Sequence, residues 1–445
     1  MTASDIIFIA LPAGDMPFVF PMGAADLVRR LKRPVRGFYS SELGDDAVRR
    51  AKAALMPVHW FYSLKPALDL SARLKRINPD IKIVSGGFTA GAYPDELLRR
   101  SEIDFIVRGD AEGPFVRLVD ALTDGGRVDD IPNLSWRGGS TPLKYQADEE
   151  TLAGSDNRDI SWFPSFEAAA MAAQKLLDVS FVYPWVVVAR GCLFDCENCF
   201  ASRASQRYLA GRGMIARPPE AVMDDLRYWS RRPDIRWCHF NSDFHSIMKS
   251  DWAGAVLDER YDLWAYYECY RIPEISFAQK MIDSFTRVHF GMFYRPDAQC
   301  AHGDVEGSGA DFEKLVRVIR HCRNRARVLL YVSPRLVSGH PDYYEGIRRL
   351  RAAGRPELKN YDESIVPPIA GQTEKERAAG FERLLGESVA SRKRLARQHR
   401  LLGAAMVKWP FLYRLLWKAS VLRIRLSMLA ARLIADSDYL CAPRL

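Results

Sequence analysis

The stretch RGCLFDCENC, residues 190–199, brings three cysteines together within eight positions. It follows the apolar run WVVVA (185–189), which has the composition of a buried strand. Soft thiolate ligands select zinc or an iron–sulfur cluster. Structural zinc needs a fourth ligand, usually from a second Cys or His pair, and none stands close in the sequence. The spacing C-x3-C-x2-C on a loop after a strand therefore indicates a 4Fe–4S cluster held by Cys192, Cys196 and Cys199.

The bulk composition fits an intracellular globular protein. The other five of the eight cysteines are scattered, as is typical of buried free thiols in a reducing compartment rather than of a disulfide framework. The 445 residues are 48% hydrophobic and 27% charged, which provides cores for two or three domains. The first residues carry neither a signal-peptide pattern nor a membrane-spanning run. We expect a cytoplasmic, oxygen-sensitive protein.

Strand-like and helix-like stretches alternate downstream of the cysteines. Apolar runs such as IRWCHF (235–240), LWAYYECY (263–270) and RVLLYVS (327–333) are each separated by an amphipathic segment. Five or more such repeats predict a full or partial parallel (β/α) barrel over residues 181–340, with its chemistry at the carboxyl ends of the strands. Residues 341–445 have a helical pattern.

The same alternation upstream predicts a doubly wound α/β domain over residues 1–130. Strand-like runs at IIFIA (6–10) and IKIVS (81–85) are separated by amphipathic helical patterns. Gly86 and Gly87 follow the second of these strands, where missing side chains would let a ligand approach the backbone. Residues 131–180 are predicted to form a linker that begins with a hairpin-like segment.

Several stretches resemble a large branch of the radical S-adenosylmethionine (SAM) superfamily, in which a cobalamin-binding domain precedes the barrel. The similarity covers about residues 5–335 and resembles the class B radical SAM methyltransferases. It implies a flavodoxin-like (Rossmann-type) cobalamin-binding domain, then the radical SAM barrel, then a helical C-terminal region. The matching stretches besides the cysteine motif are PMGAADL (21–27), NPDIKIVSGG (78–87), YPDE (93–96), IDFIVRGDAE (103–112), RPPEAV (217–222) and the E-x-x-R of 268–271.

The resemblance assigns roles to particular residues. The open iron of the cluster would chelate SAM, with Ser242 and Asp243 near its methionyl group and Glu268 and Arg271 near its ribose or carboxylate. From the residues alone, a structural ion pair between Glu268 and Arg271 is an equal alternative. The residues implied to lie against or close to cobalamin are Ser85, Gly86, Gly87, Phe88, Gly109 and Glu112.

The sequence departs from the pattern of this branch at three places. Asn198 stands where an aromatic residue usually precedes the third cysteine, and Phe200 follows it instead. Residues 291–294 read GMFY where many relatives have Gly-x-Glu-Ser. The Asp-x-His-x-x-Gly signature is absent, and His59, the only histidine before residue 180, is predicted to lie in a core or an exit loop. Cobalamin is therefore expected to have no histidine ligand from the protein.

The C-terminal segment is strongly basic. Residues 391–435 contain eleven Lys or Arg residues and no Asp or Glu, which accounts for the net charge of +9. We interpret this segment as a helix packed on the barrel with a solvated basic face, and a peripheral contact with an anionic membrane is the alternative. Nucleic-acid binding is not expected, because no nucleic-acid-binding fold accompanies the charge.

The resemblance implies a cobalamin-dependent C-methyltransferase acting on an unactivated carbon of a specialised metabolite, lipid or peptide. One SAM would methylate cobalamin, a second would yield the 5′-deoxyadenosyl radical, and an electron donor such as flavodoxin or ferredoxin would reduce the cluster. Two alternatives stay open. The same cofactors could serve a cyclisation, rearrangement or oxidation without net methyl transfer, or the chain could be a degenerate cluster-binding scaffold.

Overall fold

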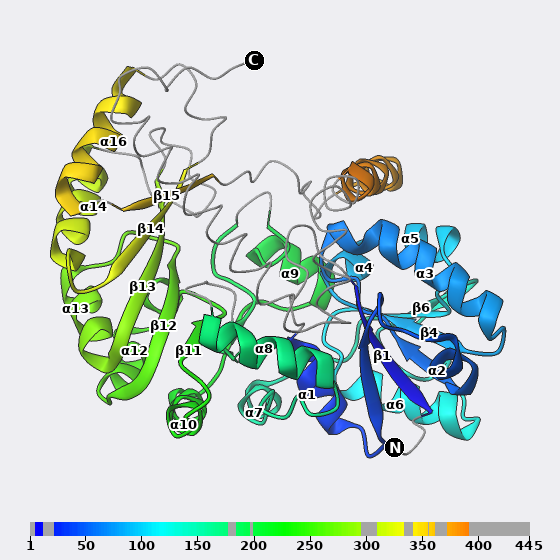
Figure 1. Ribbon diagram of the computed structural model, residues 1–445. Coiled ribbons are helices and arrows are strands. Elements are labelled where there is room, and N and C mark those ends of the chain that lie inside the picture. The colour runs from blue at the N-terminus through cyan, green and yellow to red at the C-terminus, as the bar shows by residue number, and fades with distance from the viewer. Residues whose placement is uncertain are drawn as a thin grey trace.

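The computed structural model describes residues 5–11, 22–176, 184–195, 199–294, 309–332, 341–354, 356–360 and 372–390. Two α/β units lie side by side, the first blue to cyan and the second green to yellow (Figure 1). Cys196, Asn198 and the basic segment 391–435 lie outside the described residues. The predictions for them therefore stay predictions.

The first unit is built on a sheet with the strand order β2-β1-β3-β4-β5-β6-β7. Its first five strands are parallel, and the order 2-1-3-4-5 is that of flavodoxin-like folds, as predicted. In this order the connections from β1 and from β3 lead to opposite edges of the sheet. The loops that follow these two strands therefore diverge and leave a crevice at the carboxyl ends of the strands. The strands are β1 (Ile6–Ala10), β2 (Val35–Tyr39), β3 (Ala53–Leu55), β4 (Lys82–Ser85), β5 (Phe105–Val107), β6 (Leu134–Trp136) and β7 (Gly139–Ser140).

Strand β1 is apolar on both faces because helices cover both sides of the sheet. Ile6 and Phe8 share a core with helices α1 and α6, whereas Ile7 and Ile9 share a second core with helices α2 to α5. Alternate residues of a strand point to opposite faces, so an uninterrupted apolar run is what a central strand requires. The helices are α1 (Met22–Arg30), α2 (Asp45–Arg50), α3 (Leu64–Ile77, preceded by the 3₁₀ turn Phe61–Ser63), α4 (Phe88–Ala92), α5 (Pro94–Arg100) and α6 (Glu112–Asp124).

The first unit extends further than the predicted boundary at residue 130. β6 and β7 form an antiparallel hairpin that pairs with β5, so the hairpin-like start of the predicted linker is the edge of the first sheet. The connecting segment therefore begins after Ser140. It contains α7 (Glu149–Ala153) and α8 (Pro164–Leu176), and α8 packs against β2.

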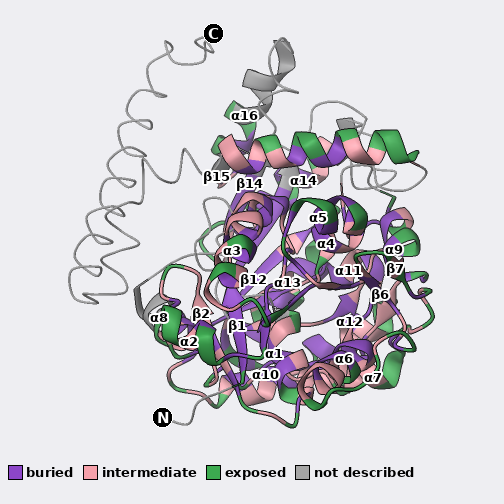
Figure 2. Ribbon diagram, turned by 90° about the vertical axis from the view of Figure 1, so that its right-hand side faces the viewer, coloured by how far each residue is buried: buried purple, intermediate pink, exposed green. Residues whose placement is uncertain are grey.

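The second unit is an open six-stranded parallel sheet, in the order β15-β14-β13-β12-β11-β8. This arrangement is the partial-barrel alternative of the prediction. In Figure 2, strands of both units are largely buried (purple). The strands are β8 (Trp185–Val186), β11 (Trp237–Phe240), β12 (Tyr261–Cys269), β13 (Phe285–Tyr294), β14 (Arg327–Val332) and β15 (Glu357–Asn360), and the helices outside the sheet are α10 (Pro219–Ser230), α12 (Ser250–Leu257), α13 (Ile275–Ser284), α14 (Gly309–Cys322) and α16 (Pro341–Gly354).

Two expectations for the second unit were wrong in detail. β15 belongs to the region predicted to be only helical, and it pairs with β14 in parallel register. The strand expected from the apolar run at residues 185–189 is split. β8 pairs with β11, whereas β9 (Ala189–Arg190) leaves the barrel and pairs with β10 (Ile215–Ala216). The Asn241 side chain causes the split, because it accepts from the Val188 amide (2.7 Å) and donates to the Ala189 carbonyl (2.8 Å) in place of a neighbouring strand.

A helix over residues 374–390 returns from the second unit to the first. Phe381 and Leu384 enter the core that contains Ile7 and Ile9 of β1. The Ser388 hydroxyl donates to the Tyr62 carbonyl (2.7 Å) and accepts from the amide of Lys65 (3.0 Å). Among the described helices, none is both long enough and apolar enough to cross a lipid bilayer.

Candidate functional site

The cysteine loop lies at the mouth of the barrel, between β9 and α9 (Arg203–Ala210). Gly191 has a φ of +85°, a conformation that favours glycine, and it turns the chain from β9 into the loop. Cys192 and Cys199 pack against one small apolar cluster and are half-buried. The amide of Phe194 donates to Cys192 Sγ at 3.5 Å. Two of the three predicted cluster ligands are thus brought together.

The surroundings of these two sulfurs suit a metal-bound thiolate. Burial raises the pKa of both the Cys192 and the Cys199 thiols, whereas nearby backbone amides oppose the shift. Amide hydrogen bonds to sulfur are one of the ways in which proteins tune iron–sulfur clusters. Among the described residues no group of three His, Cys, Asp or Glu side chains could hold a metal, and the third predicted ligand, Cys196, is not among them.

Asp243 is engaged by the protein itself and is the N-cap residue of α11 (Phe244–Ile247). Its Oδ1 accepts from the Tyr267 hydroxyl and the Ser246 amide, and its Oδ2 accepts from the Ser246 hydroxyl (2.5 Å) and the Tyr270 amide (2.6 Å). Asp243 and the neighbouring Ser242 are buried at the end of β11. These hydrogen bonds give Asp243 a structural role, and the predicted contacts of Ser242 and Asp243 with SAM stay predictions.

Glu268 and Arg271 lie on the same side of the barrel mouth, at and just after the end of β12, with different partners. Glu268 accepts a hydrogen bond from the Tyr266 hydroxyl at 3.0 Å. The Arg271 guanidinium lies 4.8 Å from the centre of the Phe194 ring, which belongs to the cysteine loop. A cation–π contact of this kind holds Arg271 beside the predicted cluster. The predicted role of these two residues in SAM binding stays a prediction.

A cavity of about 350 Å³ opens at the carboxyl ends of β1, β3, β4 and β5. The second unit closes its other side with Trp185, Arg190 and residues of α9. All six residues that the resemblance placed near cobalamin line this cavity, namely Ser85, Gly86, Gly87, Phe88, Gly109 and Glu112. The structure therefore gathers them at one site, at the topological switch point of the first sheet.

The glycines at this cavity are explained by contacts within the protein rather than by room for a ligand. Gly87 has a φ of +95°, and a Cβ there would lie 2.8 Å from the Cα of His59. Gly109 has a φ of +63°, and a Cβ there would lie 2.8 Å from the Leu209 carbonyl oxygen of α9. The first glycine lets two loops of the first unit meet, and the second lets the two units meet.

His59 lies in the loop that leaves β3, as predicted, and it also lines the cavity. Its ring contacts the Phe88 ring in a tilted arrangement, with 4.5 Å between centroids, and meets Trp60 edge-on at 5.0 Å. Burial lowers the pKa of His59 to about 4, so the imidazole is neutral at physiological pH. The sequence identified the loop, but it did not place this ring at the cavity.

Aromatic side chains connect the cysteine loop with the cavity. Phe200, the residue after Cys199, is buried and stacks on Phe88 at 6.2 Å with an interplanar angle of 23°. Phe88 in turn contacts the His59 ring. The unusual position of the aromatic residue after the third cysteine therefore has a structural reason, because from there Phe200 enters the core of the first unit.

A buried network of ion pairs also joins the two units, and sequence analysis did not predict it. Asp110 accepts from Arg190 (3.1 Å) and Arg212 (2.7 Å), while Glu112 accepts from Arg190 (2.5 Å). Burial alone would raise the pKa of Asp110, but the hydrogen bond from Arg212 and the charges of both arginines lower it overall. The RGD segment at the end of β5 was quoted in the resemblance, yet its arginine partners could not be read from it.

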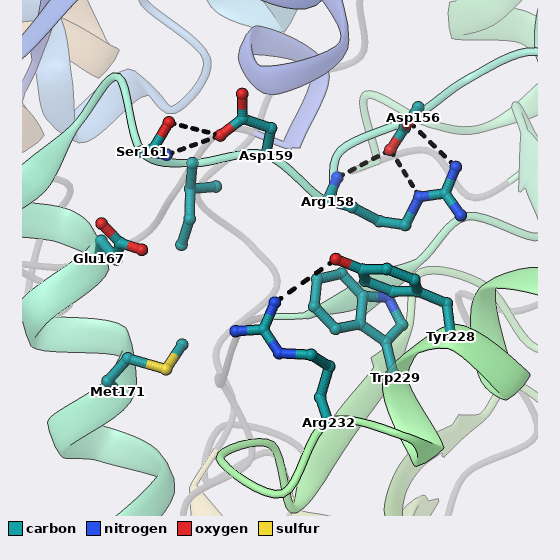
Figure 3. Close-up of a pocket in the computed structure, with 10 residues that line it drawn as sticks. Asp156, Arg158, Asp159, Ser161, Glu167, Met171, Tyr228, Trp229 and Arg232 are labelled. Carbon is teal, nitrogen blue, oxygen red and sulfur yellow. Dashed lines mark hydrogen bonds and ion pairs between the residues drawn. The ribbon is translucent and has the colours of Figure 1, made fainter.

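A second hollow, with a volume of about 590 Å³, is lined by residues of the connecting segment and of α10 (Figure 3). Arg158 pairs with Asp156 and lies over the Tyr228 ring at 4.9 Å. Arg232 pairs with Asp234 and donates to the Tyr228 hydroxyl at 3.4 Å. These cations are engaged within the protein, and none of the predicted site residues lines this hollow.

Three curated relatives share part of the sequence, and no protein-family profile matches it. An uncharacterized methyltransferase of Pyrococcus horikoshii is 27% identical over 39% of this chain and 36% of its own length. The hopanoid C-3 methylase of Methylococcus capsulatus is 23% identical over 40% of this chain and 32% of its own. The anaerobic magnesium-protoporphyrin IX monomethyl ester cyclase of Rubrivivax gelatinosus is 24% identical over 44% and 35%. The chain thus matches about a third of the length of these relatives.

Two kinds of solved structure share the fold of the chain. The radical SAM methyltransferase TsrM of Kitasatospora setae, with tryptophan and a SAM analogue bound, aligns with a TM-score of 0.57 at 15% identity, over 80% of this chain and 73% of its own. The cobalamin-dependent radical SAM enzyme OxsB, with cobalamin and SAM bound, aligns with a TM-score of 0.55 at 12% identity, over 87% and 56%. The predicted resemblance is therefore confirmed at the level of the fold.

Proposed function

We propose that the chain is a cobalamin-dependent radical SAM enzyme that transfers a methyl group to an unactivated carbon. The observation that supports this most is the shared wall between the two candidate cofactor sites. Arg190 lines the cavity of the first unit and stands two residues before Cys192. A group bound in the cavity and a cluster bound on the cysteine loop would therefore be neighbours, as a reaction using both requires.

The residues around the two sites would have distinct tasks. Cys192, Cys196 and Cys199 would hold the 4Fe–4S cluster, and Glu268 and Arg271 would orient SAM on its open iron. The six predicted residues among those that line the cavity would hold cobalamin. When bound, these groups supply a 5′-deoxyadenosyl radical and a transferable methyl group, and the protein contributes orientation and exclusion of water. A reduced flavodoxin or ferredoxin would provide the electron.

The names of the relatives support methyl transfer, and two of them bear on the class of acceptor. One relative is a hopanoid C-3 methylase, and one structural neighbour is a methyltransferase solved with tryptophan bound. A small molecule, a lipid or a peptide is accordingly the proposed substrate class. The cyclase among the relatives keeps a reaction without net methyl transfer as the second candidate.

The cluster is tested by anaerobic reconstitution of the full chain with iron, sulfide and cobalamin. Iron, labile sulfide and the electron paramagnetic resonance (EPR) spectrum of the reduced protein are then measured for the wild type and for Cys192→Ala and Cys199→Ala. Cys322→Ala is the matched control, because Cys322 is a buried free cysteine on α14. We expect the first two variants to lose the cluster and the control to keep it. Full iron and sulfide in both loop variants would contradict the proposal.

Methyl transfer is tested by the products formed from SAM. With a reductant and a candidate acceptor, the reconstituted enzyme should form S-adenosylhomocysteine and 5′-deoxyadenosine together with a methylated product. 5′-Deoxyadenosine without S-adenosylhomocysteine would favour the second candidate function. Absence of both products in a sample that contains cluster and cobalamin would contradict an enzymatic role.

A further inference from the structure

Among the residues that the structure describes, His59 is the one histidine that lines the cavity between the two units. The loop that carries it leaves β3 at the carboxyl edge of the first sheet, beside the point where the strand order reverses. Ligands of doubly wound sheets bind in this crevice. A side chain that presents a nitrogen donor there can reach a bound group directly.

The backbone and the ring of His59 are both held in place. The Thr89 amide (3.3 Å) and the Thr89 hydroxyl (3.0 Å) both donate to the His59 carbonyl oxygen. Phe88 covers one side of the ring, and the edge-on contact with Trp60 limits its rotation. Gly87 makes room for the His59 backbone, because any Cβ at this position would collide with it. Residues 86–89 (GGFT) thus hold the backbone and the ring of this histidine in place.

The ring nitrogens of His59 have no hydrogen-bond partner among the described residues, although both can form hydrogen bonds in a neutral imidazole. His239 and His289 are buried within the barrel sheet, on β11 and β13, and do not line the cavity. His59 is half-buried, lines the cavity and keeps a nitrogen lone pair that no described residue uses, and a neutral imidazole in that state can bind a metal ion.

We propose that His59 supplies an axial nitrogen ligand to the cobalt of cobalamin bound in this cavity. The inference rests on the proposed function and differs from the expectation drawn from the sequence, which gave cobalamin no histidine ligand. No carboxylate or carbonyl among the described residues accepts from the second ring nitrogen, and such acceptors make a ligating histidine more basic. The ligand is therefore weak and easily released, as suits a cobalt centre whose axial coordination must change.

The test is the EPR spectrum of cob(II)alamin bound to the full chain. The unpaired electron of this state points along the axial direction, so an axial ¹⁴N ligand splits each cobalt line into three and an axial ¹⁵N ligand into two. Protein labelled with ¹⁵N-histidine is compared with unlabelled protein, both loaded with unlabelled cobalamin. We expect threefold splitting in the unlabelled sample and twofold splitting in the labelled one.

Two variants locate the ligand within the chain. His59→Gln should bind cobalamin and lose the label-sensitive splitting, whereas His321→Gln should keep it. His321 is the matched control because it lies on α14 and hydrogen-bonds Gln279 at 2.9 Å, outside the residues that line the cavity. Label-sensitive splitting that persists in His59→Gln would overturn the proposal, since another histidine would then be the ligand.

The remaining outcomes separate this inference from the function on which it rests. If the threefold splitting is the same in the labelled and unlabelled proteins, the axial nitrogen comes from the cofactor's own base. If cobalamin is bound and the cobalt lines show no nitrogen splitting, the cobalt has no axial nitrogen ligand. Either result overturns ligation by His59 and leaves the proposed function intact. Failure of the wild type to bind cobalamin, judged by the absorption spectrum after gel filtration, would overturn both.

Discussion

Arg212 forms a bidentate ion pair with Asp110 across the boundary between the two units, with Nε 2.7 Å from Oδ2 and Nη2 2.8 Å from Oδ1. Both side chains are nearly inaccessible, with 7% and 3% exposed. Asp110 follows β5 of the first unit, and Arg212 follows α9 of the second. The pair therefore fixes the distance between the cavity at the first sheet and the cysteine loop at the barrel mouth.

Asp110→Asn should destabilise the protein strongly, because Arg212 would keep its buried charge without the carboxylate that compensates it, and Arg190 would keep only Glu112 as an anionic partner. Removing one partner of a buried ion pair costs about 3–5 kcal/mol. Thermal unfolding of the variant measures the loss. Asp129→Asn is the control, since Asp129 pairs with Arg127 on the surface, and its melting temperature should stay close to that of the wild type. Equal melting temperatures for the two variants would show that the buried network contributes little.

Gly87→Ala should cost more stability than Gly125→Ala. Both glycines have positive φ, but Gly87 (φ +95°, ψ 173°) lies in a region that is essentially restricted to glycine and faces the His59 backbone at 2.8 Å. Gly125 (φ +78°, ψ 28°) ends α6 with nothing near its missing Cβ. Strain and overpacking together predict a loss of about 2–5 kcal/mol for Gly87→Ala, and about 1–2 kcal/mol for the control. Chemical denaturation compares the two, and similar losses would refute the close approach.

Asp243→Asn and Glu268→Gln should have opposite signatures. The first variant replaces an oxygen that accepts from the Tyr270 amide or from Ser246 with a donor, which should lower stability without SAM by about 1.5–3 kcal/mol. The second should change stability little and weaken SAM binding. Thermal unfolding and equilibrium binding of SAM to the reconstituted protein give the two readouts. A stable Asp243→Asn variant that fails to bind SAM would instead support the predicted contact of Asp243 with the methionyl group of SAM.

The stability of the protein should fall on acidification partly through His239. The ring of this buried residue contacts the tilted Trp185 ring with 4.1 Å between centroids, and burial lowers the pKa of His239 to about 3. In the unfolded chain His239 binds a proton with a pKa of about 6.5, whereas in the folded chain it stays neutral down to a much lower pH. The contribution of His239 to the free energy of unfolding is therefore complete above pH ~6.5. It decreases as the pH falls, by about 2 kcal/mol between pH 7 and pH 5.

His239→Phe keeps an aromatic ring in this position and removes the titration. The free energy of unfolding should fall less between pH 7 and pH 5 for the variant than for the wild type, and the two decreases should differ by about 2 kcal/mol. An identical acid sensitivity in both proteins would assign the effect to other groups.

Local patterns were enough to predict the main elements of the fold. The apolar run of residues 6–10 predicted the strand β1, and the strand–helix alternation predicted parallel sheets. The cysteine spacing predicted a ligand loop at the barrel mouth. The split of β8 from β9 was missed, because it depends on the side chain of Asn241, which is distant in the sequence and takes the place of a neighbouring strand.

The sequence by itself determined the strands, the helices and the cysteine loop, since apolar periodicity and thiolate spacing are local properties. Only the tertiary structure decided what their residues contact. It brought Phe200 onto Phe88 and Arg212 onto Asp110, and it engaged Asp243 in capping a helix. It also placed His59 at the cavity. Such contacts join residues far apart in the chain, so their energies depend on how the two units pack and leave no periodic signal in the sequence.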